Sequence, residues 1–165
     1  MGRLDAANID LKSFTDGFYR QICGARLDPV LDSIKVYKDL GIWTEITTLV
    51  IPSLNDSNEK LRKIAEFIRD LGDETPWHVS QFYPTYKLMD IAPTSLSALR
   101  RAVEIGKEVG LKYVYQGNVP GEGENTYCPK CGKLLIGRYG YYITENHIKG
   151  SVCPFCGTKI EGVWK

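Results

Sequence analysis

The stretch WTEITTLVIPSLNDSNEKLRKIAEFIRDLG, residues 43–72, contains one complete strand–helix unit and decides the fold class. Its first residues are β-branched and apolar over a short run, which is typical of a strand. Asp56 and Glu59 are spaced as a helix capping box, and Gly72 is suited to end the helix. Between them, apolar residues recur at helical spacing, namely Leu61, Ile64, Ala65, Ile68 and Leu71. The stretch therefore predicts a strand followed by an amphipathic helix.

Segments of the same kind lie on both sides of this unit. Residues 5–14 (DAANIDLKSF) alternate apolar and polar side chains, and residues 77–83 (WHVSQFY) and 112–116 (KYVYQ) resemble the strand above. Helical patterns cover residues 28–41, opened by Asp-Pro, and residues 96–106. The alternation of strands and helices predicts an α/β fold with a parallel sheet. In such sheets, ligands bind at the carboxyl ends of the strands.

The composition is that of a soluble globular protein. The chain has 165 residues, of which 43% are hydrophobic and 25% charged, with a formal net charge of +1. No apolar run approaches the ~20 residues that a membrane helix needs, and residues 1–10 do not resemble a signal peptide. We therefore expect a cytoplasmic protein that does not bind membranes. The small net charge gives no general attraction to nucleic acid.

Two copies of one cysteine motif lie near the carboxyl end, CPKCG at 128–132 and CPFCG at 153–157. A C-x-x-C turn brings two thiolates to one metal ion, and the glycine after it permits the tight turn. Two such turns complete a tetrahedral four-sulfur site, whose predicted ligands are Cys128, Cys131, Cys153 and Cys156. The residues between the motifs alternate as a hairpin does, with 139–143 as one strand. The segment thus resembles a zinc ribbon.

Three occupants of the four-cysteine site are possible on sequence grounds. Zinc is favoured over a single iron in the same geometry, and a cytoplasmic setting disfavours two disulfides. Residues 126–165 carry six Lys or Arg against two Glu, a charge of +4, and a zinc ion with four thiolates lowers it to about +2. We therefore do not expect nucleic acid as a partner. A site filled by four protein ligands is structural, because it has no open position for chemistry.

The remaining cysteine and one histidine fall outside this motif. Cys23 is far from the others in sequence, and we interpret it as a small buried apolar side chain. His147 is interpreted as an exposed hairpin residue rather than a metal ligand. The predicted organisation is an α/β part over residues 1–117, a linker over 118–126 that is rich in Gly, Asn and Pro, and the ribbon over 127–165.

Several motifs occur in the order in which a known enzyme family has them. They are DLK (10–12), LVIPSLND (49–56), TPWHVSQFYPTYKL (75–88), YVYQGNVPG (113–121) and ENTYCPKCG (124–132). Together they resemble the later half of radical S-adenosylmethionine enzymes of the AmmeMemoRadiSam system, which are similar to pyruvate formate-lyase activating enzymes. The resemblance covers residues 5–164. It implies a fold that is the carboxyl-terminal half of a partial (βα)6 TIM-like barrel.

The resemblance also implies roles for individual residues. Asp10 and Lys12 would bind S-adenosylmethionine or the substrate, because a zwitterionic amino-acid group needs one anion and one cation. Thr47 and Tyr83 occupy positions at which the activases can carry Arg and His. Gln81 is a further candidate for the S-adenosylmethionine or substrate site.

Two more polar residues and one histidine follow from their positions in the expected strands. Gln116 and Asn118, like Gln81 and Tyr83, lie near carboxyl ends, where they could donate or accept hydrogen bonds to a ligand. His78 comes near the beginning of its strand. We interpret it as a packing residue far from the ligand site.

One feature of the family is absent. Radical S-adenosylmethionine chemistry needs C-x-x-x-C-x-x-C to hold a [4Fe–4S] cluster, and no such spacing occurs here. We therefore expect a carboxyl-terminal portion of an activase-like enzyme that is inactive alone. Its partners would be the missing amino-terminal barrel half or a second copy, with a protein as possible substrate. The alternative is an adaptor whose zinc ribbon binds nucleic acid or a protein partner.

Overall fold

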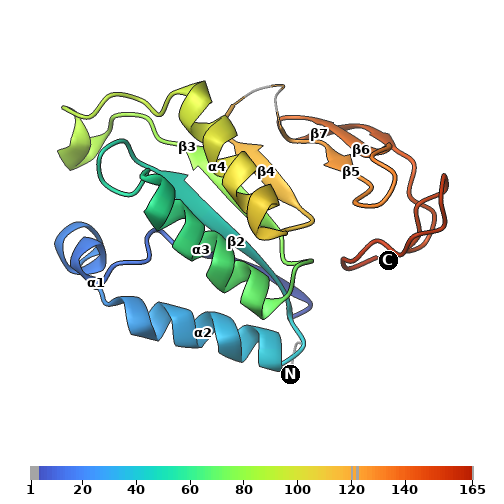
Figure 1. The fold of residues 1–165 in the computed structure, drawn as a ribbon, viewed down its shortest axis with the longest axis horizontal. Coiled ribbons are helices and arrows are strands. Elements are labelled where there is room, and N and C mark those ends of the chain that lie inside the picture. The colour runs from blue at the N-terminus through green and yellow to red at the C-terminus, as the bar shows by residue number, and fades with distance from the viewer. Residues whose placement is uncertain (1–3, 120, 122, 165) are drawn as a thin grey trace.

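A computed structural model describes residues 4–119, 121 and 123–164 (Figure 1). Within these residues it has a parallel sheet in the order β1-β2-β3-β4 and an antiparallel sheet in the order β5-β6-β7. The strands are β1 (Ala6–Asp10), β2 (Trp43–Val50), β3 (Trp77–Gln81), β4 (Val114–Gly117), β5 (Thr126–Tyr127), β6 (Leu134–Tyr139) and β7 (Tyr142–Asn146). The helices are α1 (Asp16–Phe18), α2 (Leu27–Asp39), α3 (Asn58–Leu71) and α4 (Leu96–Val109), with a π-helix η1 (Tyr19–Cys23) and a 3-10 helix η2 (Tyr86–Leu88). The predicted α/β fold with a parallel sheet is confirmed.

The main hydrophobic core lies between the parallel sheet and helices α2, α3 and α4 (Figure 1). Along β2, Ile46, Thr48 and Val50 are fully buried, and the residues between them are half-buried, as the two-residue period of a strand requires. Trp77 of β3 is buried beside them and donates its Nε1–H to Thr48 Oγ1 at 2.9 Å. Among the described helices, none combines the length and the apolar character needed to cross a membrane.

The opposite face of the parallel sheet is not covered by these helices, and polar side chains lie along it. Asp10 of β1 pairs in register with Thr47 of β2. Thr47 pairs in turn with His78 of β3, which pairs with Tyr115 of β4. Because residues paired in register point to the same side of a sheet, these four side chains form one row across what we call the open face.

Residues 126–164, which we call the ribbon, pack against the amino-terminal edge of the open face. Ala6 and Trp43 lie at the first residues of their strands, and with residues 160–164 they line a cavity of about 300 Å³. Tyr113, just before β4, is buried in the hydrophobic cluster of the ribbon and donates its hydroxyl to Glu161 Oε2 at 3.0 Å. The core of the ribbon is thus completed by the parallel sheet.

The amino-terminal cap of α3 differs from the prediction. Ser57, not Asp56, is the cap residue, and its hydroxyl accepts from the backbone N–H of Lys60 at 3.4 Å. Asp56 instead accepts from the backbone N–H of Ser53 at 2.8 Å, inside the preceding turn, where Ser53 has a φ of 65°. The capping box was the wrong interpretation because Asp and Ser both favour caps, and the Asp side chain is used by the turn.

The hairpin of the ribbon also differs from the prediction. Residues 139–143 do not form one strand, because the chain turns at Gly140 between β6 and β7. Gly140 has a φ of 57°, which glycine adopts readily. The three tyrosines around it, Tyr139, Tyr141 and Tyr142, favour strands, and this hid the turn from the sequence pattern.

Candidate metal centre and carboxyl-end cleft

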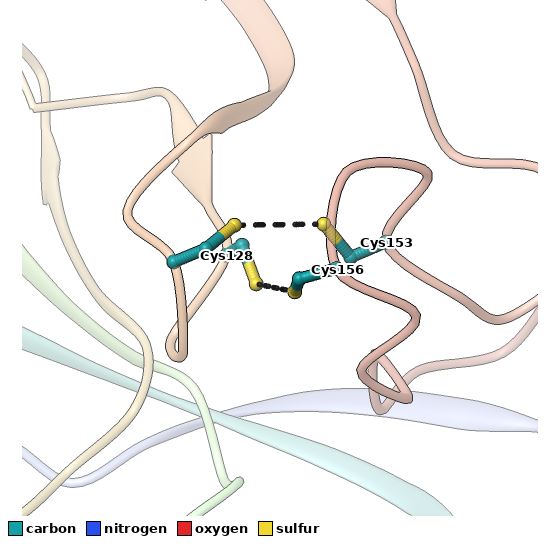
Figure 2. Close-up of side chains that lie close together, drawn as sticks. Cys128, Cys153 and Cys156 are labelled. Atoms are coloured by element: carbon teal, nitrogen blue, oxygen red, sulfur yellow. Dashed lines mark hydrogen bonds between the residues drawn. The ribbon is translucent and has the colours of Figure 1, made fainter.

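The four cysteines of the two C-x-x-C motifs meet at one point of the ribbon. Their Sγ atoms all lie within 4.8 Å of one another. They form two facing pairs, Cys128 with Cys156 at 3.7 Å and Cys131 with Cys153 at 3.8 Å. Figure 2 shows two dashed contacts between the sulfurs and labels Cys128, Cys153 and Cys156. Four sulfurs at ~2.3 Å from a tetrahedral ion are about 3.8 Å apart, whereas a disulfide joins sulfurs at about 2.0 Å. The four residues therefore fit a single metal ion.

The sequence builds each half of this centre in the same way. The backbone N–H of Gly132 donates to Cys128 O at 2.9 Å, and that of Gly157 donates to Cys153 O at the same distance. Both glycines have positive φ, 69° and 71°, so the predicted need for glycine after each C-x-x-C is confirmed. The hydrogen bond between Cys156 Sγ and Thr158 Oγ1 lowers the pKa of Cys156 to about 6. This thiol can therefore become a thiolate ligand at neutral pH.

The other cysteine and the ribbon histidine lie outside the cluster. His147 bonds Glu145 Oε2 at 2.7 Å, and its side chain is 41% exposed, as expected of a hairpin residue. Cys23 ends the π-helix η1 and is half-buried against the main core. It also lines a cleft at the carboxyl ends of the strands, which the interpretation of a simple buried thiol did not include.

The predicted pair Asp10 and Lys12 does come together. Lys12 Nζ lies 3.0 Å from Asp10 Oδ2, and the two side chains are 39% and 54% exposed respectively. Both lie at the carboxyl end of β1, an edge strand of the described sheet. Opposite charges are thus available side by side at the end where parallel sheets bind ligands.

A cleft of about 730 Å³ opens at the carboxyl ends of β2 and β3, within the usual size range of ligand sites. It is lined by four of the candidate residues, Lys12, Gln81, Tyr83 and Asn118. The Tyr83 hydroxyl donates to Gln81 Oε1 at 2.7 Å, and Asn118 Nδ2 donates to Gln81 O at 3.1 Å. These polar groups therefore form one connected wall.

Three other candidates do not line this cleft. Thr47 lies on the open face in the middle of β2, before the carboxyl end of the strand, and donates its hydroxyl to Asn8 Oδ1 at 2.8 Å. Asp10 reaches the cleft only through its ion pair with Lys12. Gln116 is buried on the other side of β4, and among the described residues its Oε1 has no hydrogen-bond partner.

Backbone strain gathers at the same cleft. Tyr86 and Asn118 line it and have φ values of 52° and 62°. Positive φ is a clear outlier for a residue as bulky as tyrosine. Strained residues persist where the surrounding structure holds them, most often at binding sites. This observation supports the cleft as a functional site.

Two buried polar residues that organise the cleft were missed in the sequence. Asn55 accepts from the Ile51 N–H at 2.6 Å and donates to Lys12 O and Leu49 O at 2.6 and 2.8 Å. Thr94 donates its hydroxyl to Val50 O and accepts from the Phe82 N–H. Through these hydrogen bonds, Asn55 links the carboxyl ends of β1 and β2, and Thr94 links those of β2 and β3. The only sequence signal was an Asn or Thr within a Pro-containing loop, which predicts a turn but not its burial.

His78 lies on the open face and outside the residues that line the cleft. Register pairs Ile46 with Trp77, so β3 begins three residues after the start of β2, and His78 is level with Thr47. The imidazole Nε2 lies 2.7 Å from Glu45 Oε2, and the ring stacks on Tyr115 with centroids 5.1 Å apart. These contacts agree with its interpretation as a packing residue, and His78 does not line the cleft at the carboxyl ends of the strands.

The Glu45 carboxylate accepts a hydrogen bond from Trp43 Nε1 at 3.0 Å and bonds His78 Nε2 at 2.7 Å. Burial raises its pKa, but hydrogen bonds from His78 and Trp43 outweigh burial and leave the pKa below the ordinary 4.5. A depressed pKa in the folded state contributes stability above pH ~4.5, which is lost as the pH falls through the folded value.

We expect Glu45→Gln to remove this part of the acid sensitivity. The stability advantage of the wild type over the variant should shrink as the pH falls from ~5 towards 3. Urea titrations of both proteins from pH 7 to pH 3 measure it. A difference that stays constant down to pH 3 would contradict a depressed Glu45 pKa.

Comparison with known proteins gives one strong and two weaker likenesses. No protein-family model matches the chain. The chain is 51% identical over 162 residues to an uncharacterized protein of Methanocaldococcus jannaschii, which covers 96% of this chain and 48% of that protein. It is 30% identical over 98 residues to the pyruvate formate-lyase-activating enzyme of Clostridium pasteurianum, covering 53% of this chain and 41% of that enzyme.

A solved structure shares the fold. A domain of the pyruvate-formate lyase-activating enzyme from Bacteroides vulgatus superposes with a TM-score of 0.58 and 19% identity, over 69% of this chain and 68% of that one. The chain is thus distantly similar in sequence and fold to activating enzymes of this kind. It spans less than half the length of the curated relatives that it matches.

Proposed function

We propose that this chain is part of a radical S-adenosylmethionine enzyme of the activase type and contributes one side of its S-adenosylmethionine and substrate site. The observation that carries the proposal is the Asp10–Lys12 ion pair at the carboxyl end of β1, beside the cleft. Its anion and cation suit the ammonium and carboxylate of one amino-acid group. The distant likeness to activating enzymes in sequence and fold supports the same reading.

The parallel sheet would be half of a partial (βα)6 barrel. In the described residues, no strand pairs with the outer edge of β1, whose side chains alternate between exposed and half-buried. An unpaired edge strand is a site for adding another strand. We propose that an amino-terminal barrel half, or a second copy of the chain, pairs there. The length of the curated relatives leaves room for such a half.

The chemistry of the whole enzyme would be shared between the two halves. A [4Fe–4S] cluster binds S-adenosylmethionine at an open iron and supplies the electron that cleaves it. The four ribbon cysteines already form their own group in the described chain, so the cluster would belong to the other half. Here Asp10 would accept from the ammonium group and Lys12 would donate to the carboxylate. Tyr83, fixed by Gln81, would bound the substrate side of the cleft.

The ribbon metal is proposed to be zinc. Four thiolates favour zinc in a structural site, since all positions are filled by protein. Elemental analysis of purified protein should give one zinc per chain. One iron per chain, with the visible colour of an iron–thiolate centre, would instead assign a rubredoxin-like site.

Binding of S-adenosylmethionine to the purified chain tests the proposed function. We expect Lys12→Met to weaken binding about tenfold or more, because a charge-assisted hydrogen bond to the carboxylate is lost. Lys35→Met is the matched control, since Lys35 is exposed on α2 and pairs only loosely with Asp32 at 3.8 Å. Isothermal titration calorimetry gives the affinities. Equal affinities for the two variants, or no binding by the wild type at millimolar ligand, would refute the assignment.

A second candidate function is that of a protein-binding adaptor. Tyr139, Tyr141 and Tyr142 at the β6–β7 turn are all exposed, and tyrosine is enriched where proteins bind one another. An adaptor would bind its partner through this turn and would not need Asp10 or Lys12. Nucleic acid is a weaker possibility, for which affinity would fall steeply with salt concentration.

A further inference from the structure

A continuous line of contacts joins the ribbon to the imidazole of His78. The Arg138 guanidinium of β6 lies over the Tyr115 ring of β4, 5.9 Å from its centroid. The Tyr115 ring stacks on His78 of β3 at 24° between ring planes. His78 Nε2 in turn bonds the Glu45 carboxylate of β2 at 2.7 Å. The line therefore crosses from the ribbon over three strands of the parallel sheet.

The ribbon end of this line is held firmly. Arg138 Nη1 donates to Thr126 Oγ1 at 2.7 Å and to Glu124 O at 3.0 Å. The backbone N–H of Arg138 donates to Asn125 Oδ1 at 2.7 Å. The Tyr115 hydroxyl bonds the same Thr126 Oγ1 at 3.0 Å. Both members of the cation–π pair are thus fixed to β5 and the residues just before it.

The other end of the line fixes the tautomer of the His78 ring. An ionised Glu45 can only accept, so His78 Nε2 carries a hydrogen, and whenever the ring is neutral its lone pair is on Nδ1. Among the described residues, no partner of Nδ1 is seen. The His78 side chain is 27% exposed, and it lines a cavity of about 310 Å³ with Glu124 and Arg138. Nδ1 is therefore a hydrogen-bond acceptor that the fold itself does not use.

We propose that the ribbon holds a functional imidazole in position. Arg138, acting through Tyr115, positions the His78 ring, and Glu45 fixes its tautomer. As a result, Nδ1 of the neutral ring is presented to a ligand. The ligand group would be a hydrogen-bond donor, such as an ammonium or a hydroxyl. His78 shares its register row with Asp10 and Thr47, so the acceptor faces the same side of the sheet as the proposed S-adenosylmethionine residues. The positioning itself does not depend on the proposed function.

¹⁵N NMR of the imidazoles tests whether the tautomer of His78 is fixed in this way, and the chain supplies an internal control. Its two histidines both bond a glutamate at 2.7 Å, but only His78 stacks on Tyr115. At pH 8 we expect His78 to favour the Nε2–H tautomer by about tenfold or more, because its acceptor is charged. Glu45→Gln should remove most of that preference and leave the spectrum of His147 unchanged.

The role of Arg138 is tested by two substitutions that do not touch the imidazole. Arg138→Leu should lower the tautomer ratio of His78 about two- to fivefold, the range expected for loss of a cation–π contact. Arg138→Lys keeps the charge and should restore most of the ratio. Tyr115→Phe keeps the stack and should resemble wild type, whereas Tyr115→Leu should resemble Arg138→Leu. Metal content of each variant verifies that the ribbon is folded.

Two outcomes would overturn the inference. A His78 tautomer ratio that is the same in wild type, Arg138→Leu and Tyr115→Leu would show that Glu45 alone holds the ring. A mixed tautomer in the wild type would show that Nδ1 is not presented as an acceptor. Neither result depends on whether S-adenosylmethionine binds, so failure of the proposed function is recognised separately.

Discussion

Removal of the ribbon metal, or the substitution Cys153→Ser, is expected to unfold the ribbon while the parallel sheet and its helices stay folded. Cys153, labelled in Figure 2, is buried, and its sulfur lies 3.8 Å from that of Cys131. Metal binding in small zinc domains supplies on the order of 10 kcal/mol. Loss of one ligand should therefore remove most of the free energy that keeps the ribbon folded.

The separation of two hydrophobic clusters is the reason for expecting local unfolding. The main cluster joins the parallel sheet to helices α2, α3 and α4 and includes Trp77. The ribbon cluster is much smaller, and two of its buried members are Cys128 and Cys153 themselves. So small a core does not hold a fold without a metal or another covalent link. Tyr113 belongs to the ribbon cluster, so we expect the start of β4 to become exposed as well.

The tryptophans report on the two clusters separately. The Trp164 indole N–H donates to Ile160 O at 2.9 Å within the ribbon, whereas Trp77 is buried in the main core. In ¹H–¹⁵N NMR spectra, chelation should shift the Trp164 indole signal to its unfolded position and leave that of Trp77 dispersed. Cys23→Ser is the control, because Cys23 lies outside the four-cysteine group, and it should retain one metal per chain. Loss of both indole signals together would mean that the two clusters unfold as one unit.

The elements that could be predicted from the sequence are those whose signal is local. Helical spacing at Leu61, Ile64 and Ile68 gave α3, and all three side chains are buried against the sheet. The repeated C-x-x-C-G pattern gave the four-sulfur centre, because the turn, the glycine and the ligands are adjacent in the chain. Each of these features depends on residues only a few positions apart.

What could not be predicted depends on contacts between distant segments. The row that contains Asp10 and His78 exists because β3 pairs with the middle of β2, and no local pattern gives that offset. Asn55 resembles any polar loop residue, yet it bonds Lys12, which is 43 positions away. Burial of a polar side chain is decided by whether such partners are present, and a single sequence does not list them.

Substitution of Asn55 by alanine is expected to lower the free energy of unfolding by about 3 kcal/mol or more. The side chain is fully buried and makes hydrogen bonds with the backbone of Ile51, Lys12 and Leu49. Alanine leaves one N–H and two carbonyl groups without partners, and each buried unpaired group costs about 1–3 kcal/mol. The loss is expected to be smaller than the full sum, because water can enter near the strand ends.

The same substitution should disturb the candidate site. Asn55 Nδ2 is bonded both to Lys12 O and to Leu49 O, so it fixes the distance between the ends of β1 and β2. Without this bond, the Lys12 side chain loses the backbone support that keeps it beside Asp10. We expect exchange broadening of the Lys12 backbone signal in NMR spectra, while the Trp77 indole signal in the core stays sharp.

Two further variants test whether hydrogen bonding or shape explains the effect at position 55: a control at another asparagine, and a substitution that keeps the shape of Asn55. Asn8→Ala removes an exposed side chain whose only described hydrogen bond is to the Thr47 hydroxyl, and it should change stability by less than about 0.5 kcal/mol. Asn55→Asp keeps the shape and the acceptor for Ile51 but presents an oxygen to both carbonyl groups. It should therefore destabilise the protein at least as much as Asn55→Ala at pH 7. Urea unfolding gives all three values, and an Asn55→Asp variant as stable as wild type would show that shape, not donation to Lys12 and Leu49, is what the position requires.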